Sequence, residues 1–116
     1  MPPFDAEQLL RQYGDEALVR DLAELVVSTV PAQIEAVQEA VRARDSVAIR
    51  AAAHKLRGSI ASFALPEAVE TARQLETIAA GGDLSNADEL SSDLAVAARS
   101  LCDSANAWLA ANAPPA

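Results

Sequence analysis

The chain of 116 residues has one cysteine, one histidine, four glycines and only 3% aromatic residues. A single cysteine cannot form an intramolecular disulfide, and one cysteine with one histidine cannot build a cysteine- or histidine-rich metal site. No apolar run approaches the 18 or so residues of a membrane-spanning helix. The first residues lack the positive and apolar regions of a secretory signal peptide. We therefore expect no metal, no membrane contact and a cytoplasmic setting.

Basic residues are also scarce, with nine Lys and Arg against 17 Asp and Glu and a net charge of −8. Nucleic-acid binding over a whole surface needs the opposite sign, because the phosphate backbone is recognised by Lys and Arg. We therefore expect no nucleic-acid partner.

Alanine is what the chain has in abundance, with 27 residues, and 51% of all residues are hydrophobic. Alanine is the best helix former, whereas glycine, β-branched and aromatic residues favour other states. The length is that of one domain. We expect a single all-α domain over residues 1–116, ordered from about 5 to 112, with a tail at 113–116.

Capping and breaking residues divide the chain into five helices. Asp5 is suited to cap a short helix through Gln12, which Gly14 stops. A second helix begins at Asp15 and continues to about Arg44. It passes Pro31, which we expect to bend the helix without ending it, because the apolar stripe continues on both sides.

Three further helices follow at short intervals. The third carries apolar residues at spacings of 4, 3, 4 and 3 from Ile49 to Phe63. Pro66 suits the first position of the fourth, which Gly81 and Gly82 end, and Ser85 or Asn86 caps the last. Long amphipathic helices with short connections predict an antiparallel four-helix bundle with a short additional N-terminal helix.

The single histidine, His54, lies away from the predicted core. At 100° per residue the stripe from Ile49 to Phe63 falls within about 40° of Ile49, whereas His54 falls at about 140°. A histidine buried in the core is therefore disfavoured.

Basic residues flank His54 on the same helix: Arg50, Lys55 and Arg57. In an acidic protein they form a local positive patch suited to an anionic group. For Lys55, an ordinary solvated position is an equally fair interpretation.

Gly58 lies one turn beyond His54, although a glycine inside a helix costs about 1 kcal/mol relative to alanine. It either admits another surface close to the imidazole or allows a close helix crossing. We favour access, because Gly58 is on the side away from the core.

Glu76 lies at the edge of the apolar stripe of the fourth helix. His54 is eleven residues before Leu65, at the bend, and Glu76 is eleven after it, so an antiparallel helix pair brings them to the same height. Glu76 would accept a hydrogen bond from Nδ1–H, which fixes the tautomer and leaves Nε2 free as a nucleophile. The alternative is a glutamate that reaches solvent from the edge of the bundle.

The run Ala53-His54-Lys55-Leu56-Arg57-Gly58-Ser59, followed by Phe63 and Leu65, resembles the signature of histidine-containing phosphotransfer (HPt) domains. Glu76 falls where that family has Gln or Glu beside the histidine. One departure is Ala64, where many members have glycine between the third and fourth helices. The helix pattern extends the likeness over nearly the whole chain.

The resemblance implies a phosphorelay intermediate. His54 would accept a phosphoryl group from the aspartyl phosphate of a response-regulator receiver domain and pass it to another receiver. Lys55, Arg57 and Arg50 would offset phosphoryl charge, and the receiver would bring Mg²⁺, so no cofactor is expected on this chain. No nucleotide-binding loop is present, so the domain would not be a kinase.

Small and apolar residues around His54, namely Ala51, Ala61 and Leu65 together with Gly58, would form the docking surface. In family members the receiver also touches the N-terminal helix, here Phe4 to Gln12. A hybrid histidine kinase is a further expected partner. Two alternatives remain open: a phosphotransfer domain phosphorylated by a chemotaxis-type histidine kinase, and a docking adaptor without phosphotransfer. The intact set of His54, Arg57, Gly58 and Glu76 argues against an adaptor.

Overall fold

The computed structural model describes residues 2–113, and these residues form five α-helices without a strand. This confirms the all-α prediction. The predicted tail falls mostly outside the described residues, which end at Ala113. The bounds of the helices are α1 Ala6–Tyr13, α2 Glu16–Arg42, α3 Ser46–Ile60, α4 Pro66–Gly81 and α5 Ala87–Ala111.

Side chains and glycines set most helix ends as the sequence predicted. Asp5 and Asp15 accept hydrogen bonds from backbone N–H groups in the first turns of α1 and α2. Gly14 and Gly82 end α1 and α4 in the left-handed conformation, at φ of 70° and 80°. Pro66 occupies the first turn of α4, where its missing N–H is not needed.

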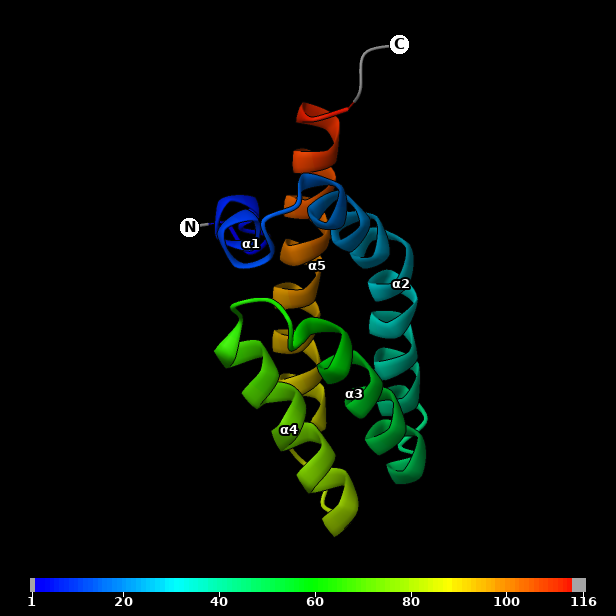
Figure 1. Cartoon of the computed structure of the whole chain (residues 1–116). Coiled ribbons are helices and arrows are strands. Elements are labelled where there is room, and N and C mark those ends of the chain that lie inside the picture. Colours follow the sequence, from blue (N-terminus) through cyan, green and yellow to red (C-terminus); the bar gives the residue numbers. More distant parts are fainter. Residues whose placement is uncertain (1, 114–116) are drawn as a thin grey trace.

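Helices α2 to α5 form an antiparallel bundle in which each helix packs against the next and α5 closes the ring against α2 (Figure 1). α3 and α5 therefore lie diagonally across the bundle from each other. α2 continues through Pro31, as predicted, and Figure 1 shows it curving along its length. None of the described helices is both long and apolar enough to cross a bilayer.

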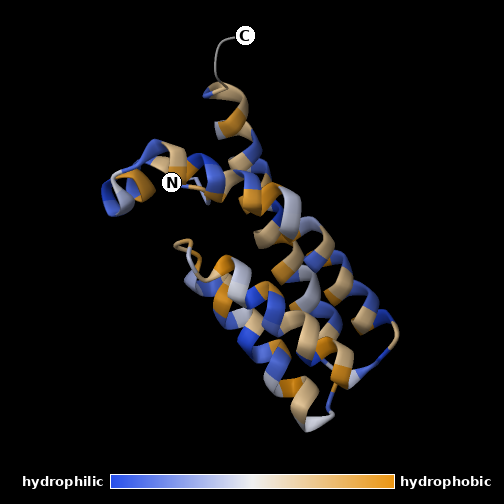
Figure 2. Ribbon diagram, turned by 45° about the vertical axis from the view of Figure 1, so that its right-hand side comes forward, coloured by the Kyte–Doolittle hydropathy of each residue, from blue (hydrophilic) through white to orange (hydrophobic). Residues whose placement is uncertain are grey.

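The core consists of the inner stripes of the helices, and Figure 2 shows hydrophobic and hydrophilic residues alternating along each of them. Ile49, Leu56 and Ile60 of α3 are fully buried in the same core cluster as Leu75 of α4 and Leu101 of α5. Alanines fill many of the remaining core positions, and their small side chains let the helices approach closely.

α1 crosses the end of the bundle near the C-terminal part of α5 (Figure 1). Phe4, just before α1, is buried between Phe63 and Trp108, with ring centroids 5.8 Å apart in each pair. Its N–H donates to the Ser104 hydroxyl at 3.1 Å. Trp108 covers this end of the bundle, as the sequence suggested, and Cys102 is a buried core residue.

Asn86 is the N-cap residue of α5, as predicted, but two predicted helix ends differ in detail, because α1 ends at Tyr13 and not at Gln12, and α2 ends before Arg44. α2 ends at Arg42, before Arg44, because Arg44 adopts a left-handed φ of 53° and its guanidinium bonds to Asp88 at 2.7 Å. Asn86 stands at the start of α5 but its side chain makes no capping bond. Ser85 instead donates to Asp83, from both its N–H and its hydroxyl.

Candidate functional site

His54 lies on the outer face of α3, and 70% of its side-chain surface is exposed. Two residues close to His54 in the sequence, Ala53 and Leu56, are fully buried on the inner face of α3. The apolar stripe thus anchors α3 while the imidazole stands in solvent, as the helical wheel predicted.

Glu76 of α4 reaches the imidazole across the α3–α4 pair. Its Oε1 lies 2.9 Å from Nδ1 of His54, and only 13% of its side-chain surface is exposed. A carboxylate only accepts hydrogen bonds, so this contact requires the proton on Nδ1. In that tautomer Nε2 carries a free lone pair.

Arg57 pairs with the same carboxylate. Its Nε donates to Oε2 of Glu76 at 2.5 Å, and its Nη2 lies 3.5 Å from Oε1. Nη2 also lies 3.2 Å from Nδ1 of His54. His54, Arg57 and Glu76 therefore form one contact cluster, in which the guanidinium is on the Nδ1 side of the ring.

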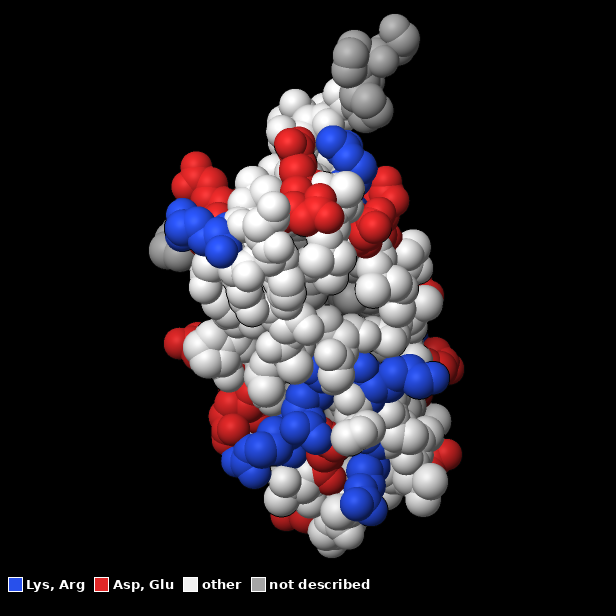
Figure 3. All heavy atoms as spheres, viewed as in Figure 1, with Lys and Arg blue, Asp and Glu red and all other residues white. Residues whose placement is uncertain are grey.

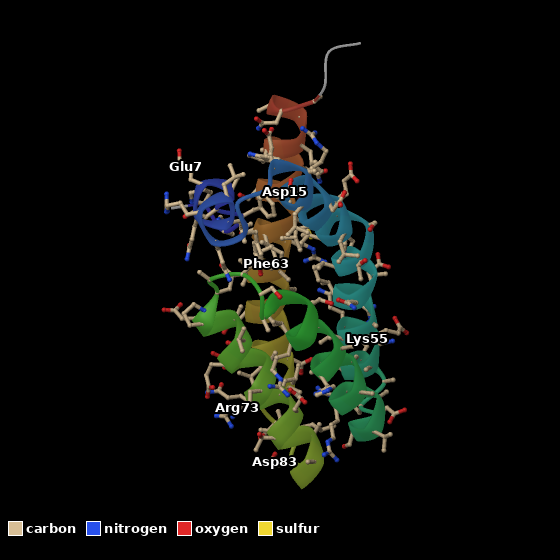
Figure 4. All side chains as sticks on the ribbon, viewed as in Figure 1. Glu7, Asp15, Lys55, Phe63, Arg73 and Asp83 are labelled. Carbon is tan, nitrogen blue, oxygen red and sulfur yellow. The ribbon has the colours of Figure 1, made fainter. Side chains whose placement is uncertain are left out.

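Figure 3 shows Lys and Arg gathered over α3 and α4 around a small acidic patch, whereas acidic residues dominate the opposite end of the same face. Arg50 and Lys55 are both exposed. Figure 4 shows Lys55 and Arg73 on opposite sides of the α3–α4 pair. Within the described part of the chain, neither the Arg50 nor the Lys55 side chain makes a hydrogen bond or ion pair; the Ser59 hydroxyl donates only to the backbone carbonyl of Lys55. The two charges are therefore available to an anion.

Arg73 is a cation of this face that the sequence analysis did not single out. It donates from Nε and Nη2 to the carboxylate of Glu70, at 2.8 and 2.5 Å. These hydrogen bonds hold the pKa of the Glu70 carboxyl below its ordinary value. The pair has the same chemistry as Arg57 and Glu76 but makes no hydrogen bond or ion pair with His54.

Gly58 is exposed, and a Cβ added to it would have no atom outside its own helix turn within 4 Å. A close helix crossing at Gly58 is therefore excluded. Of the other predicted docking residues, Ala51 and Ala61 are exposed, and Leu65 is half-buried at the start of α4.

Two hollows border the exposed face of α3. The first lies between α2 and the C-terminal half of α3, and its lining includes Leu22 and Leu25 of α2, Gly58 and Ser59 of α3, and Phe63 after α3. Leu25 is 59% exposed. The second lies toward the start of α3, where Val47, Arg50 and Ala51 border His54 and Glu76.

Leu25 was missed by sequence reasoning. At 100° per residue Leu25 falls about 60° to one side of Leu22, whereas Val26 and Val30 fall about 40° and 80° to the other side. A leucine outside the apolar stripe is therefore the signal that would have marked it as exposed.

Within residues 2–113 no three His, Cys, Asp or Glu side chains come together as metal ligands would. The groups available for chemistry at this site are the imidazole of His54, the carboxylate of Glu76, and the charged side chains of Arg50, Lys55 and Arg57.

Fold and site together define a class: a helical bundle that presents one oriented histidine to solvent beside a positive patch. The family model of the Hpt domain matches residues 21–108, which is most of the chain. The chain belongs to the Hpt family. Comparisons with curated proteins and with solved structures found no significant match.

Hpt domains serve histidine phosphotransfer in two-component signalling, where they interact with receiver domains and kinases. They are phosphocarriers without a kinase or ATP-binding site of their own.

Proposed function

We propose that His54 accepts a phosphoryl group from the aspartyl phosphate of a receiver domain and passes it to the aspartate of another receiver. The observation that carries the proposal is the pairing of an exposed imidazole with a carboxylate 2.9 Å from Nδ1. This arrangement leaves Nε2 as the nucleophile and directs it to solvent, where a second protein can reach it.

The transfer needs positioning and charge neutralisation more than covalent machinery. As Nε2 attacks phosphorus, the ring gains positive charge, and Glu76 offsets it through the Nδ1 proton. Lys55, Arg50 and the Nη1 donor of Arg57 are suited to the phosphoryl oxygens. The receiver supplies Mg²⁺, and the chain itself needs no cofactor.

The receiver docks over α3 and the hollow that separates it from α2. The surface around Nε2 carries no bulky side chain at Gly58, Ala61 and Ala51, so a second protein can approach the imidazole closely. Leu25 and Leu22 provide apolar surface next to Gly58, and Leu65 borders the same face. Such partners operate in the cytoplasm, which is where we place this carrier.

The test is to incubate the protein with phosphorylated receivers from the same genome and follow the label. Label should appear on this chain in an acid-labile, base-stable form, as expected for phosphohistidine, and should then move to a second receiver. Failure of every phosphorylated receiver to label His54, with labelling by a histidine kinase instead, would assign the chain to the kinase-served alternative.

A further inference from the structure

A third hollow lies on the side of the bundle away from His54. It separates α2 from α5, whereas His54 and Glu76 belong to α3 and α4, the opposite pair in the ring of helices. Its volume is about 210 Å³, several times the roughly 30 Å³ that one water takes up in the liquid. The hollow is therefore large enough for a small anion and is separate from the phosphotransfer site.

Arginines line this hollow from both helices, Arg42 from α2 and Arg99 from α5. Arg42 Nη2 donates to the carboxylate of Glu39 at 2.8 Å. Arg99 Nη2 donates at 3.3 Å to the amide oxygen of Gln38, which is a neutral acceptor. Arg99 makes no ion pair with any described residue, although Asp103 lies four residues further along α5. Its positive charge is therefore not neutralised.

One carboxylate among the described residues, that of Asp88, also reaches the lining. Arg44 already pairs with it, with Nη2 2.7 Å from Oδ2. The carboxylate of Glu39 is likewise paired with Arg42. After these two neutral pairs the charge of Arg99 is left over, so the hollow suits an anion better than a cation.

A buried serine in the lining has a hydroxyl without a partner. Ser91 is only 5% exposed, and its hydroxyl makes no hydrogen bond to the part of the chain that the structure describes. Buried polar groups are normally hydrogen-bonded, and a hydroxyl can donate one bond. An oxyanion in the hollow supplies the acceptor that Ser91 lacks.

We propose that this hollow binds a phosphate group, either as the free ion or as a small phosphate monoester. Arg42 and Arg99 donate charge-assisted hydrogen bonds from the two walls, because planar guanidinium groups match the oxygens of a phosphate. The hydroxyl of Ser91 donates from the floor, and that of the exposed Ser92 from the rim. The carrier can therefore hold this ligand while a receiver occupies the face around His54.

The first measurement is a titration of the nitrogen-15-labelled protein with inorganic phosphate, followed through the backbone amide signals. Sodium chloride keeps the ionic strength constant. The amides of Ser91, Ser92 and Arg99 should shift and reach saturation. Shifts confined to the surroundings of His54, or equal shifts with sodium chloride in place of phosphate, would overturn the proposal.

The second measurement repeats the titration with two pairs of variants. Arg99→Gln should raise the Kd for phosphate at least about tenfold, as expected for one charge-assisted hydrogen bond. Arg73→Gln makes the same change of charge on α4, outside the lining, and should leave the Kd unchanged. Ser91→Ala should raise the Kd at least about twofold, and Ser100→Ala, at an exposed position of the same helix, should not. Arg99→Gln and Ser91→Ala variants that bind as their controls do would overturn the site.

Glycerol 3-phosphate in the same titration distinguishes the two sources of the phosphate group. Tighter binding than that of inorganic phosphate identifies a monoester as the ligand, and weaker binding identifies the free ion. A Kd above about 10 mM for both would contradict the proposal. His54→Gln leaves the hollow intact and should bind phosphate as wild type does, so this site and the proposed phosphotransfer stand or fall separately.

Discussion

At the scale of single residues, the two nitrogens of one imidazole have different surroundings. Nδ1 of His54 faces Glu76 and Arg57, and 70% of the side chain is open to solvent. Under the proposed function, His54 therefore reacts through a group that adds little to the core. Its removal should separate function from stability.

His54→Gln should abolish phosphoryl acceptance and change the free energy of unfolding by no more than about 1 kcal/mol, as expected for a surface substitution. Labelling by a phosphorylated receiver and urea unfolding measure the two effects. Label on the variant would show that another residue is the acceptor, and a large loss of stability would show that the imidazole supports the fold.

Cys102 is a second residue whose environment sets its chemistry. Burial, with a smaller contribution from the charge of Asp103, raises the pKa of the thiol above its ordinary value. The folded chain therefore keeps the thiol protonated at a pH where the unfolded chain has begun to form thiolate.

Alkylation by iodoacetamide at pH 8.5 should consequently be at least about tenfold slower in the folded protein than in urea, because the thiolate is the reactive form. Stability should also fall as the pH rises through the ordinary thiol range, since the unfolded chain then loses its proton first. Equal alkylation rates in both states would show that Cys102 is accessible.

At the scale of helices, the sequence predicts elements better than contacts. Spacing placed His54 outside the core and Glu76 opposite it, because a helical period fixes the direction of each Cβ. It did not predict that Arg57 pairs with Glu76, because a long side chain finds its partner across two helices. The left-handed turn at Arg44 was missed for a similar reason, since its guanidinium bonds to Asp88, 44 residues away.

Gly58 gives a test at this scale, because a Cβ there meets open space. Gly58→Ala should stabilise the bundle by up to about 1 kcal/mol through helix propensity, with transfer retained. Gly58→Glu should keep the stability but block transfer, because a bulky carboxylate would stand beside the phosphoryl path. Thermal unfolding and receiver labelling measure both variants; destabilisation by Gly58→Ala would reveal a packing role.

At the scale of the whole molecule, basic and apolar residues gather on the exposed face of α3 and the hollow beside it, although the protein as a whole is acidic. The chain carries a net charge of −8, yet Arg50, Lys55 and Arg57 lie together on α3. α5 lies diagonally opposite α3 and carries its own exposed apolar residue, Val96, which is 65% exposed. Leu25, beside α3, and Val96, on α5, are therefore suited to a matched pair of surface substitutions.

Leu25→Asp should weaken receiver binding by about 1 kcal/mol or more, or at least about fivefold in Kd, as expected for a central apolar contact. Val96→Asp adds the same charge to α5, which lies diagonally opposite α3, and should leave Kd unchanged. Titration calorimetry with one receiver compares the two. Equal weakening would mean that overall charge matters and that the hollow beside Gly58 is not the docking surface.

The contact of Phe4 with Trp108 allows the position of the N-terminal segment to be followed by intrinsic tryptophan fluorescence. Trp108 is the chain's single tryptophan, half-buried against Phe4 and with the Arg20 guanidinium 5.7 Å from its ring centre. Light absorbed at 295 nm is therefore emitted from one place, where the N-terminal segment meets the end of the bundle. If that segment moved away from the bundle, the indole would be exposed to water and its emission would shift to longer wavelength. Titration with a receiver can therefore detect movement of α1 without an added dye.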